Sequence, residues 1–235
     1  MNGEPMVEMR GVVKNYNALR PLRIAELSVA RGARVALSGI DAGGAEVMLN
    51  LVTGASLPDQ GEVRVFGRDT AAVSDGDEWL ASLDCFGIVS ERAVLLEGAT
   101  LTQNLALPFA LDIDPVPAET IARVESLSDE CGIGREFLRE RAGDVPTAIR
   151  TRVHLARAIA LGPNLLLMEH PTAALDERDG AAFGELVAHV CDARALTLLA
   201  VTQDLAFASA AAHETLSLQA ATGRLSAARR SWWRR

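Results

Sequence analysis

The chain of 235 residues is 49% hydrophobic and 23% charged, and its formal net charge is −8 at pH 7. This composition is typical of a folded globular protein and excludes a largely disordered chain. The acidic balance and the low aromatic content of 4% argue against nucleic-acid binding, which needs a basic face and commonly a platform for base stacking.

The first third of the chain predicts strands separated by turns. Apolar and β-branched residues favour strands over Val7–Val13 and Leu22–Val29, and RVALSG at Arg34–Gly39 is typical of a buried strand. A glycine-rich turn, Gly39–Gly44, leads into a helix predicted over Ala45–Val52. Strand, glycine-rich loop and helix in this order are the local arrangement of a phosphate-binding loop.

The remainder alternates strand and helix patterns. Further strands are predicted over Glu62–Phe66, Phe86–Val89, Asn164–Met168 and Leu196–Thr202. Helical periodicity is found in Thr100–Arg141, which Pro115 and Pro117 interrupt, and in Thr151–Ala160 and Asp179–Ala193. The alternation predicts an α/β fold with a mostly parallel sheet, and the middle helical block predicts an inserted helical subdomain.

The cysteine and hydropathy patterns indicate the cellular compartment in which we expect the chain. Cys85, Cys131 and Cys191 are far apart and form no CxxC pair, so we expect reduced structural thiols. The four histidines show no metal-ligand spacing. The N-terminal stretch begins acidic, and no run of about 18 apolar residues occurs, so we expect neither a signal peptide nor a membrane span. The expected location is the cytoplasm.

Several segments, taken in order, resemble the ATP-binding cassette (ABC) ATPase family over nearly the whole chain. They are GIDAGGAE (39–46) followed by VMLNLVTG, PDQGEVRVFGRD (58–69), FGIVSE (86–91), LEGATLTQNLALPF (96–109), RVHLARAIALGPNLLLMEHPTAALD (152–176) and VTQDL (201–205). The resemblance implies a P-loop NTPase-type sheet core with an inserted helical subdomain. It divides the chain into core residues 1–95, helical subdomain 96–150, core residues 151–222 and a basic, Trp-rich tail, 223–235.

The phosphate-binding loop departs from its pattern, G-x-x-x-x-G-K-[ST]. Gly39 and Gly44 keep the turn, but Ala45 stands at the lysine position and Glu46 at the hydroxyl position. The lysine neutralises phosphate oxygens and the hydroxyl binds Mg²⁺. Because Ala45 supplies no charge and Glu46 supplies the opposite one, we expect binding of ATP and Mg²⁺ to be weak or absent. The only lysine, Lys14, is an unlikely substitute.

Other motif positions depart as well. The resemblance places an adenine-stacking aromatic at Tyr16, the glutamine loop at Glu91 and the switch histidine at Gln203. The Asp-Glu pair of the family falls on Glu169 and His170. The signature position, where the family has glycines that approach the γ-phosphate, falls on Val145, Pro146, Thr147, Ala148 and Ile149, and Pro146 lacks an N–H donor. The D-loop residue Asp176, at the dimer interface of the family, is intact.

Two interpretations stand at several of these positions. Glu169 as a Mg²⁺ ligand with His170 as a base is one hypothesis; a decayed site is the other, and Ala45 and Glu46 favour it. Tyr16 is either an adenine-stacking residue or a strand-edge tyrosine.

The glycines of the turn and two acidic residues also allow either a functional or a purely structural interpretation. Gly39, Gly43 and Gly44 form either an anion-binding nest or a tight turn. In the second case, we expect Glu46 to satisfy the helix N-terminus in place of a phosphate. Asp176 is either a dimer contact or a turn residue.

The C-terminal RRSWWRR has an unusual composition. It is either a docking segment for anionic lipid or an acidic protein face, or an unstructured terminus. The residues concerned are Arg229, Arg230, Trp232, Trp233, Arg234 and Arg235.

The sequence therefore predicts a degenerate ABC subunit of a membrane transport complex, a pseudo-ATPase at the inner face of the membrane. The resemblance implies a transmembrane permease, contacted near Glu91 and Leu96–Phe109, and a homo- or heterodimer with another cassette. One alternative is an active ATPase with unorthodox residues or a composite site, energising transport of lipid or hydrophobic cargo. Others are a soluble ABC protein acting on nucleic acid and an unrelated P-loop kinase.

Overall fold

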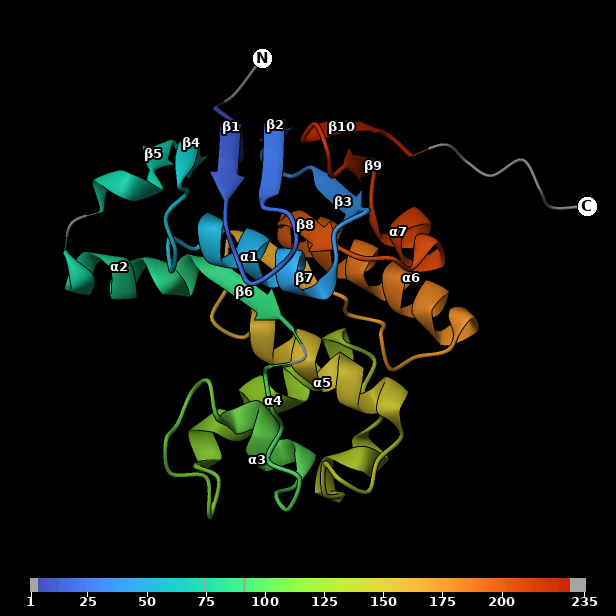
Figure 1. The fold of residues 1–235 in the computed structure, drawn as a ribbon. Helices are drawn as coiled ribbons and strands as arrows, with labels where there is room; N and C mark the ends of the chain where they lie inside the picture. Colours follow the sequence, from blue (N-terminus) through green and yellow to red (C-terminus); the bar gives the residue numbers. More distant parts are fainter. Residues whose placement is uncertain (1–3, 74, 91, 229–235) are drawn as a thin grey trace, which may run out of the picture.

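The computed structural model describes residues 4–73, 75–90 and 92–228. Within them the chain forms two lobes, a core that carries the β-sheets and a lobe of helices beside it (Figure 1). The helical lobe is inserted between strands β6 (Phe86–Val89) and β7 (Leu165–Glu169) of the core. The predicted α/β core with an inserted helical subdomain is thus confirmed.

A four-stranded antiparallel sheet, in the order β2-β1-β4-β5, covers one side of the core. Its strands are β1 (Val7–Lys14), β2 (Leu22–Val29), β4 (Gln60–Val65) and β5 (Arg68–Asp69). Residues of β1 alternate between a buried side, with Val7 and Met9, and an outer side, with Glu8 and Arg10. This alternation is what an antiparallel sheet with one solvated face requires.

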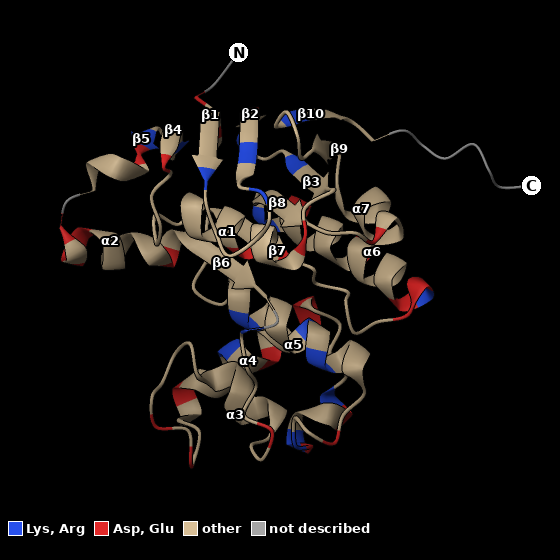
Figure 2. Cartoon of the chain, viewed as in Figure 1, with Lys and Arg blue, Asp and Glu red and all other residues tan. Residues whose placement is uncertain are grey.

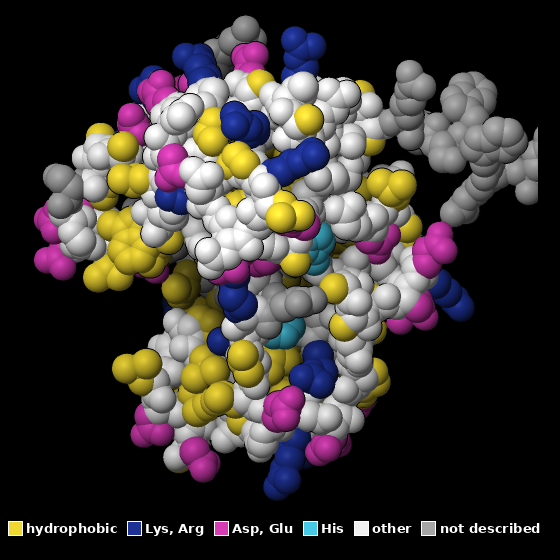
Figure 3. Space-filling model, viewed as in Figure 1, with side chains coloured by type: hydrophobic (Ala, Val, Ile, Leu, Met, Phe, Trp, Pro, Cys, Tyr) yellow, Lys and Arg dark blue, Asp and Glu magenta, His cyan; other side chains and the backbone are white. Residues whose placement is uncertain are grey.

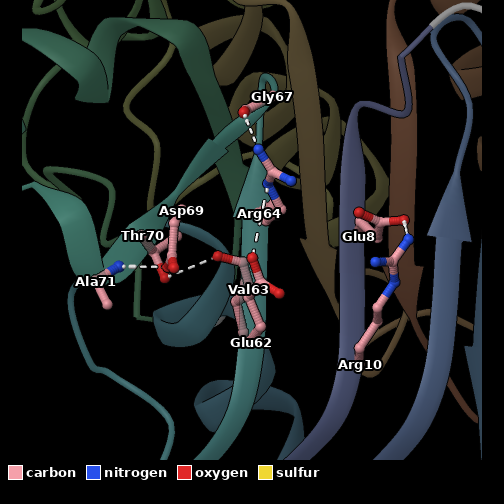
Figure 4. A network of polar contacts seen from close by, with 9 residues as sticks. All are labelled: Glu8, Arg10, Glu62, Val63, Arg64, Gly67, Asp69, Thr70 and Ala71. Atoms are coloured by element: carbon pink, nitrogen blue, oxygen red, sulfur yellow. Dashed lines mark hydrogen bonds and ion pairs between the residues drawn. The ribbon is translucent and has the colours of Figure 1, made fainter.

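Charged side chains on that outer face pair with one another. Arg10 Nη2 lies 2.6 Å from Glu8 Oε1 on β1. On β4, Arg64 lies 3.8 Å from Glu62 and donates to the Gly67 carbonyl (Figure 4). Charges of both signs are likewise interspersed over both lobes in the view of Figure 2. We therefore interpret this face as a solvated surface.

A six-stranded sheet in the order β10-β9-β3-β8-β7-β6 forms the centre of the core. It is parallel from β9 to β6, as the alternation of strands and helices predicts, and β10 pairs antiparallel with β9. Its remaining strands are β3 (Arg34–Ser38), β8 (Thr197–Val201), β9 (Glu214–Gln219) and β10 (Arg224–Ala227).

Helix α1 (Ala42–Val52) lies between the two sheets, where Met48 shares one hydrophobic cluster with Ile24 of β2 and Leu165 of β7. The opposite face of β7, with Leu166, belongs to a second cluster that reaches the helices on the other side. Because β7 is buried on both faces, its sequence is a continuous apolar run. The helices on that other side of the core are α6 (Glu177–Arg194) and α7 (Leu205–Ala211).

The helical lobe is tied to the core by an arginine. Arg194, at the end of α6, holds Glu130 through two N–O contacts of 2.6 Å and donates to the Ile159 carbonyl at 2.7 Å. This fork geometry is the strongest form of an arginine–carboxylate pair. The lobe contains α3 (Leu101–Ala106), α4 (Ala118–Glu130), the 3-10 helix η3 (Arg135–Arg139) and α5 (Thr147–Ile159).

Most predicted elements are found, with corrections at their ends. Strands β2 and β6 have the predicted bounds. Helix α1 begins at Ala42 and not at Ala45, because Asp41 caps it. Helix α5 begins four residues before the predicted Thr151, because the carbonyl of the N-cap residue Pro146 accepts from the Arg150 N–H at 3.1 Å and so starts the helix. The long helical block is three short helices separated by loops.

Some elements were not predicted. They are α2 (Gly76–Ser82), α7, β5, β9, β10 and two further short 3-10 helices, η1 (Thr70–Ala72) and η2 (Leu83–Cys85). Strand β10 falls in the segment 223–235, so the first residues of the predicted tail belong to the sheet. The tail residues 229–235 lie outside the described residues.

The three cysteines are free, as expected. Burial raises the pKa of Cys131 and of Cys191 to about 12, which makes both thiols inert. In the part of the chain that the structure describes, no helix combines the length and apolar character needed to cross a membrane.

Candidate functional site

The turn at the end of β3 depends on glycine at its first position. Gly39 has φ +79°, and a Cβ atom there would lie 2.8 Å from the Leu218 carbonyl oxygen. A side chain is therefore excluded both by the left-handed backbone and by the approach of β9. The chain then passes Ile40 and Asp41 and enters α1.

Asp41 satisfies the N-terminus of α1. Its Oδ1 accepts a hydrogen bond from the Gly44 N–H at 2.7 Å, while its carbonyl accepts from the Ala45 N–H at 2.8 Å. The expectation that Glu46 takes this role is wrong, because a helix that begins at Ala42 places Glu46 in its second turn. Two of the loop's backbone donors are thus already used within the chain.

Tyr16 lies against the same glycines. Its hydroxyl donates to Asp41 Oδ1 at 3.1 Å, and its ring atoms come within 3.2 to 3.4 Å of where a Cβ of Gly43 would stand. Gly43 and Gly44 are needed for this contact, since a Cβ on Gly44 would be 3.1 Å from the Tyr16 hydroxyl. Burial, and then the hydrogen bond to Asp41, raise the pKa of Tyr16.

Arg92 joins the two acidic residues of the site. Its Nη1 lies 2.5 Å from Glu46 Oε1 on α1, and its Nη2 lies 2.8 Å from Glu169 Oε2 at the end of β7. The Glu169 side chain is 11% exposed, whereas those of Arg92 and Glu46 are about half exposed at 48% and 49%. Arg92 is not among the predicted site residues, because it lies 46 positions after Glu46 and no sequence pattern pairs the two.

His170 follows Glu169 directly after β7, and Gln203 lies two residues after the end of the neighbouring strand β8. His170 has φ +43°, a strained conformation for a residue with a side chain, and its N–H donates to the Val201 carbonyl at 2.8 Å. Among the described residues, its Nε2 has no hydrogen-bond partner. Gln203 Nε2 donates to the Ile40 carbonyl at 2.7 Å, so this side chain holds the turn before α1.

The signature position lies at the start of α5. Val145 is buried, and Pro146 is the N-cap residue, whose carbonyl accepts from the Ile149 N–H at 2.9 Å. The first turn of the helix is Thr147, Ala148 and Ile149. The stretch carries no glycine, so backbone approach to a phosphate is less open here than in a glycine-rich turn.

Other predicted site residues have local roles or lie outside the described part. Asp176 caps α6, with its Oδ1 accepting from the Asp179 N–H at 2.8 Å. Lys14 pairs with Asp59 at 3.1 Å and is not at the P-loop. Glu91 lies outside the described residues.

The donor set around α1 does not match the one that Mg²⁺-ATP takes in a P-loop. The hydroxyl ligand is replaced by Glu46, and the lysine is replaced by Ala45, which is fully buried. Within residues 4–73, 75–90 and 92–228, no group of three or more His, Cys, Asp or Glu is placed to hold a metal ion.

A groove of about 370 Å³ lies between the core and the helical lobe. Figure 3 shows it as a hollow with hydrophobic side chains on both sides. Burial, with help from Arg157 and Arg150, lowers the pKa of His154 in this groove to about 4. The residues that line the groove include Phe86, Ile88, Leu107, His154, Arg157 and Leu161.

Comparison with known proteins identifies the family. The family model described as ABC transporter matches residues 22–173, which is more than half of the chain. The chain belongs to the ABC transporter family. The predicted resemblance is thus confirmed.

The curated relatives serve several different transport systems. The lipoprotein-releasing system ATP-binding protein LolD of Alcanivorax borkumensis is 29% identical over 88% of this chain and 92% of its own length. The macrolide export ATP-binding/permease protein MacB of Azoarcus sp. is 31% identical over 85% of this chain. The chain spans only 31% of that protein, and 54% of the Fe(3+) ions import ATP-binding protein FbpC of Mesorhizobium japonicum.

Solved structures agree with the fold. The dimeric ABC transporter cassette MJ0796 matches with a TM-score of 0.77 at 23% identity, covering 95% of this chain and 99% of that one. The cbiO1 protein of Clostridium perfringens, described as part of the complex cbiONQ, matches with a TM-score of 0.79 at 17% identity over 95% and 88%. At these identities the likeness concerns the fold alone.

Proposed function

We propose that this chain is a cassette subunit of a membrane transport complex that does not hydrolyse ATP and acts as a structural partner. The observation that carries the proposal is the Arg92 guanidinium between Glu46 and Glu169. The resemblance assigns these two positions to Mg²⁺ and phosphate binding, and the Arg92 guanidinium between the two carboxylates supports a cleft that holds no nucleotide.

Electrostatics support weak nucleotide binding. A carboxylate about 4 Å from a phosphate charge costs about 4 kcal/mol at an effective dielectric constant of 20. Glu46 and Glu169 share the single guanidinium of Arg92, so this cluster keeps an excess of negative charge, and Ala45 adds no positive charge. Each 1.4 kcal/mol corresponds to about tenfold in affinity, so loss by orders of magnitude is expected.

The backbone donors of the loop support the same conclusion. A phosphate bound at a helix N-terminus needs N–H groups that point toward it. Here Asp41 Oδ1 accepts from the Gly44 N–H, and the Tyr16 side chain packs against Gly43 and Gly44. Both contacts would have to break before a phosphate reached this helix end.

The groove supports docking on a partner. Its apolar wall is continued by exposed side chains, with Ile88 39%, Val94 72% and Leu161 55% exposed. An apolar surface of this kind beside a polar rim is typical of a protein interface. We propose that a permease covers this groove at the inner face of the membrane, and that the chain pairs with a second cassette, as the dimeric MJ0796 structure suggests.

The test is phosphate release from millimolar ATP with Mg²⁺ by the purified chain. We expect no release above the buffer background. The matched control is the triple variant Ala45→Lys, Glu46→Thr, His170→Glu, which puts back the family residues without touching the groove. Release by the wild-type chain that Glu169→Gln abolishes would overturn the proposal.

A further inference from the structure

A cleft at α1 is lined by Tyr16, Asp41, Gly43 and Glu46, and one short segment connects it with the groove. This strap, residues 92–97, leaves the core after β6 and enters the helical lobe before α3. Arg92 at its beginning contacts two elements of the core, α1 through Glu46 and β7 through Glu169. The first residue of the strap is therefore fixed to the core by side-chain charge.

The rest of the strap is fixed to the helical lobe. The Val94 carbonyl accepts from Arg157 Nη1 of α5 at 2.9 Å. The Leu96 N–H donates to Asn104 Oδ1 at 2.8 Å, and Asn104 Nδ2 donates back to the Leu96 carbonyl at 3.0 Å. Asn104 is fully buried, so this pair of bonds has little freedom to rearrange.

The strap also borders the groove. Ala93 is among the residues that line it, together with Arg157, and Val94 is 72% exposed. A partner seated in the groove therefore touches the strap directly. The strap is thus the physical link between that partner and the cleft at α1.

We propose that Arg92 is an internal substitute for nucleotide, and that its two ion pairs hold the strap and the helical lobe in one fixed arrangement without any ligand. The inference rests on the proposed function in one respect, that the cleft holds no nucleotide. It adds that the arrangement presented to the groove partner is constant, and that Arg92 fixes it at the strap as Arg194 does at the end of α6.

Two features of the charges support the proposal that the Arg92 ion pairs tether the strap to the core. Arg92 holds two like charges, Glu46 and Glu169, on one guanidinium. The guanidinium uses separate nitrogens for the two carboxylates, which a single ammonium group matches less well. Removal of Arg92 therefore both frees the strap and repels the elements that it joined.

The experiment is amide hydrogen exchange of the full chain, read at Ala93, whose N–H donates to the Ser90 carbonyl at 3.1 Å. In Arg92→Gln we expect exchange at this amide to be about three- to tenfold faster, as loss of a local tether predicts, while the Leu96 amide stays protected by Asn104. Arg92→Lys should give a smaller increase. The matched control is Arg135→Gln, which removes another exposed ion pair, to Asp129, elsewhere in the lobe and should leave the strap unchanged.

Exchange at β7 and β8 amides reports on global unfolding and should stay at the wild-type rate. Equal strap exchange in wild-type and Arg92→Gln proteins would overturn the tether. ATP with Mg²⁺ should not change strap exchange in the wild-type chain, and a change would overturn the substitution of Arg92 for nucleotide. Phosphate release measured separately decides the proposed function, so the two can fail independently.

Discussion

Arg92 Nη1 lies 2.5 Å from Glu46 Oε1, which places a guanidinium beside the P-loop helix of a chain that has alanine at the lysine position. A positive charge is therefore present beside α1, but it comes from another segment and is paired with carboxylates. A phosphate would have to compete with Glu46 and Glu169 for it.

Placing the family's residues at positions 45 and 46 of the P-loop should increase the affinity for nucleotide. The double variant Ala45→Lys, Glu46→Thr adds the charge and the hydroxyl, and removes one partner of Arg92. We expect ATP to bind at least about tenfold more tightly than to the wild-type chain, measured by calorimetry with Mg²⁺.

Ala45→Lys alone is the control for this variant. It keeps the carboxylate of Glu46, which repels a phosphate, so we expect a smaller gain. If the double variant binds no more tightly than the wild-type chain, the account of why the P-loop is weak is wrong.

The titration of Tyr16 reports directly on its hydrogen bond to Asp41, because Tyr16 is the only tyrosine in the chain. Burial and the hydrogen bond to Asp41 raise its pKa above the ordinary value. In Asp41→Asn the carboxylate charge is lost, and in Asp41→Ala the acceptor is lost as well. We expect the pKa of Tyr16 to fall in both variants, followed by tyrosinate absorbance in alkaline titration.

Asp41→Ala should also destabilise the fold by about 1 kcal/mol through loss of the cap on α1, while Asp41→Asn keeps most of it. Urea unfolding separates these two effects. An unchanged tyrosinate titration in both variants would show that Tyr16 does not lie on Asp41 in solution.

His154 predicts a loss of stability in acid. Its pKa is about 4 in the folded chain, below the ordinary 6.5 or so of the unfolded chain. The unfolded state therefore binds more protons between these pH values, and stability falls as the pH drops through that range. We expect His154→Gln to lose less stability between pH 7 and pH 4.5 than the wild-type chain, in urea unfolding.

Carboxylates titrate in the same range, so the comparison with the wild-type chain cancels their contribution. His189→Gln, at an exposed position on α6, is the matched control and should follow the wild-type curve. Parallel curves for all three proteins would exclude His154 as a source of acid sensitivity.

The sequence predicted the fold because its strands have clear periods. β7 and β8 are continuous apolar runs, and β1 alternates, as two-sided and one-sided burial require. Helix α1 was placed three residues late, because a cap by Asp41 was not distinguished from a glycine loop. Strand β9, with its mixed residues, carried no comparable signal.

The site was predicted in part. The unusual residues at the lysine and hydroxyl positions, Ala45 and Glu46, are visible in the sequence, and they led to the expectation of weak nucleotide binding. The partner of Glu46 was not predictable, since Arg92 lies 46 positions away and meets it only through the fold. The same holds for Tyr16 and Asp41, which are separated by 25 positions.

The central claim, that the chain fills its own nucleotide cleft, is tested most directly by calorimetric titration of the wild-type chain with ATP, with and without Mg²⁺. We predict no heat of binding up to millimolar ATP in either condition. Binding in the micromolar range would contradict the claim, because it would require ATP to displace Arg92 and the Tyr16–Asp41 contact without a P-loop lysine.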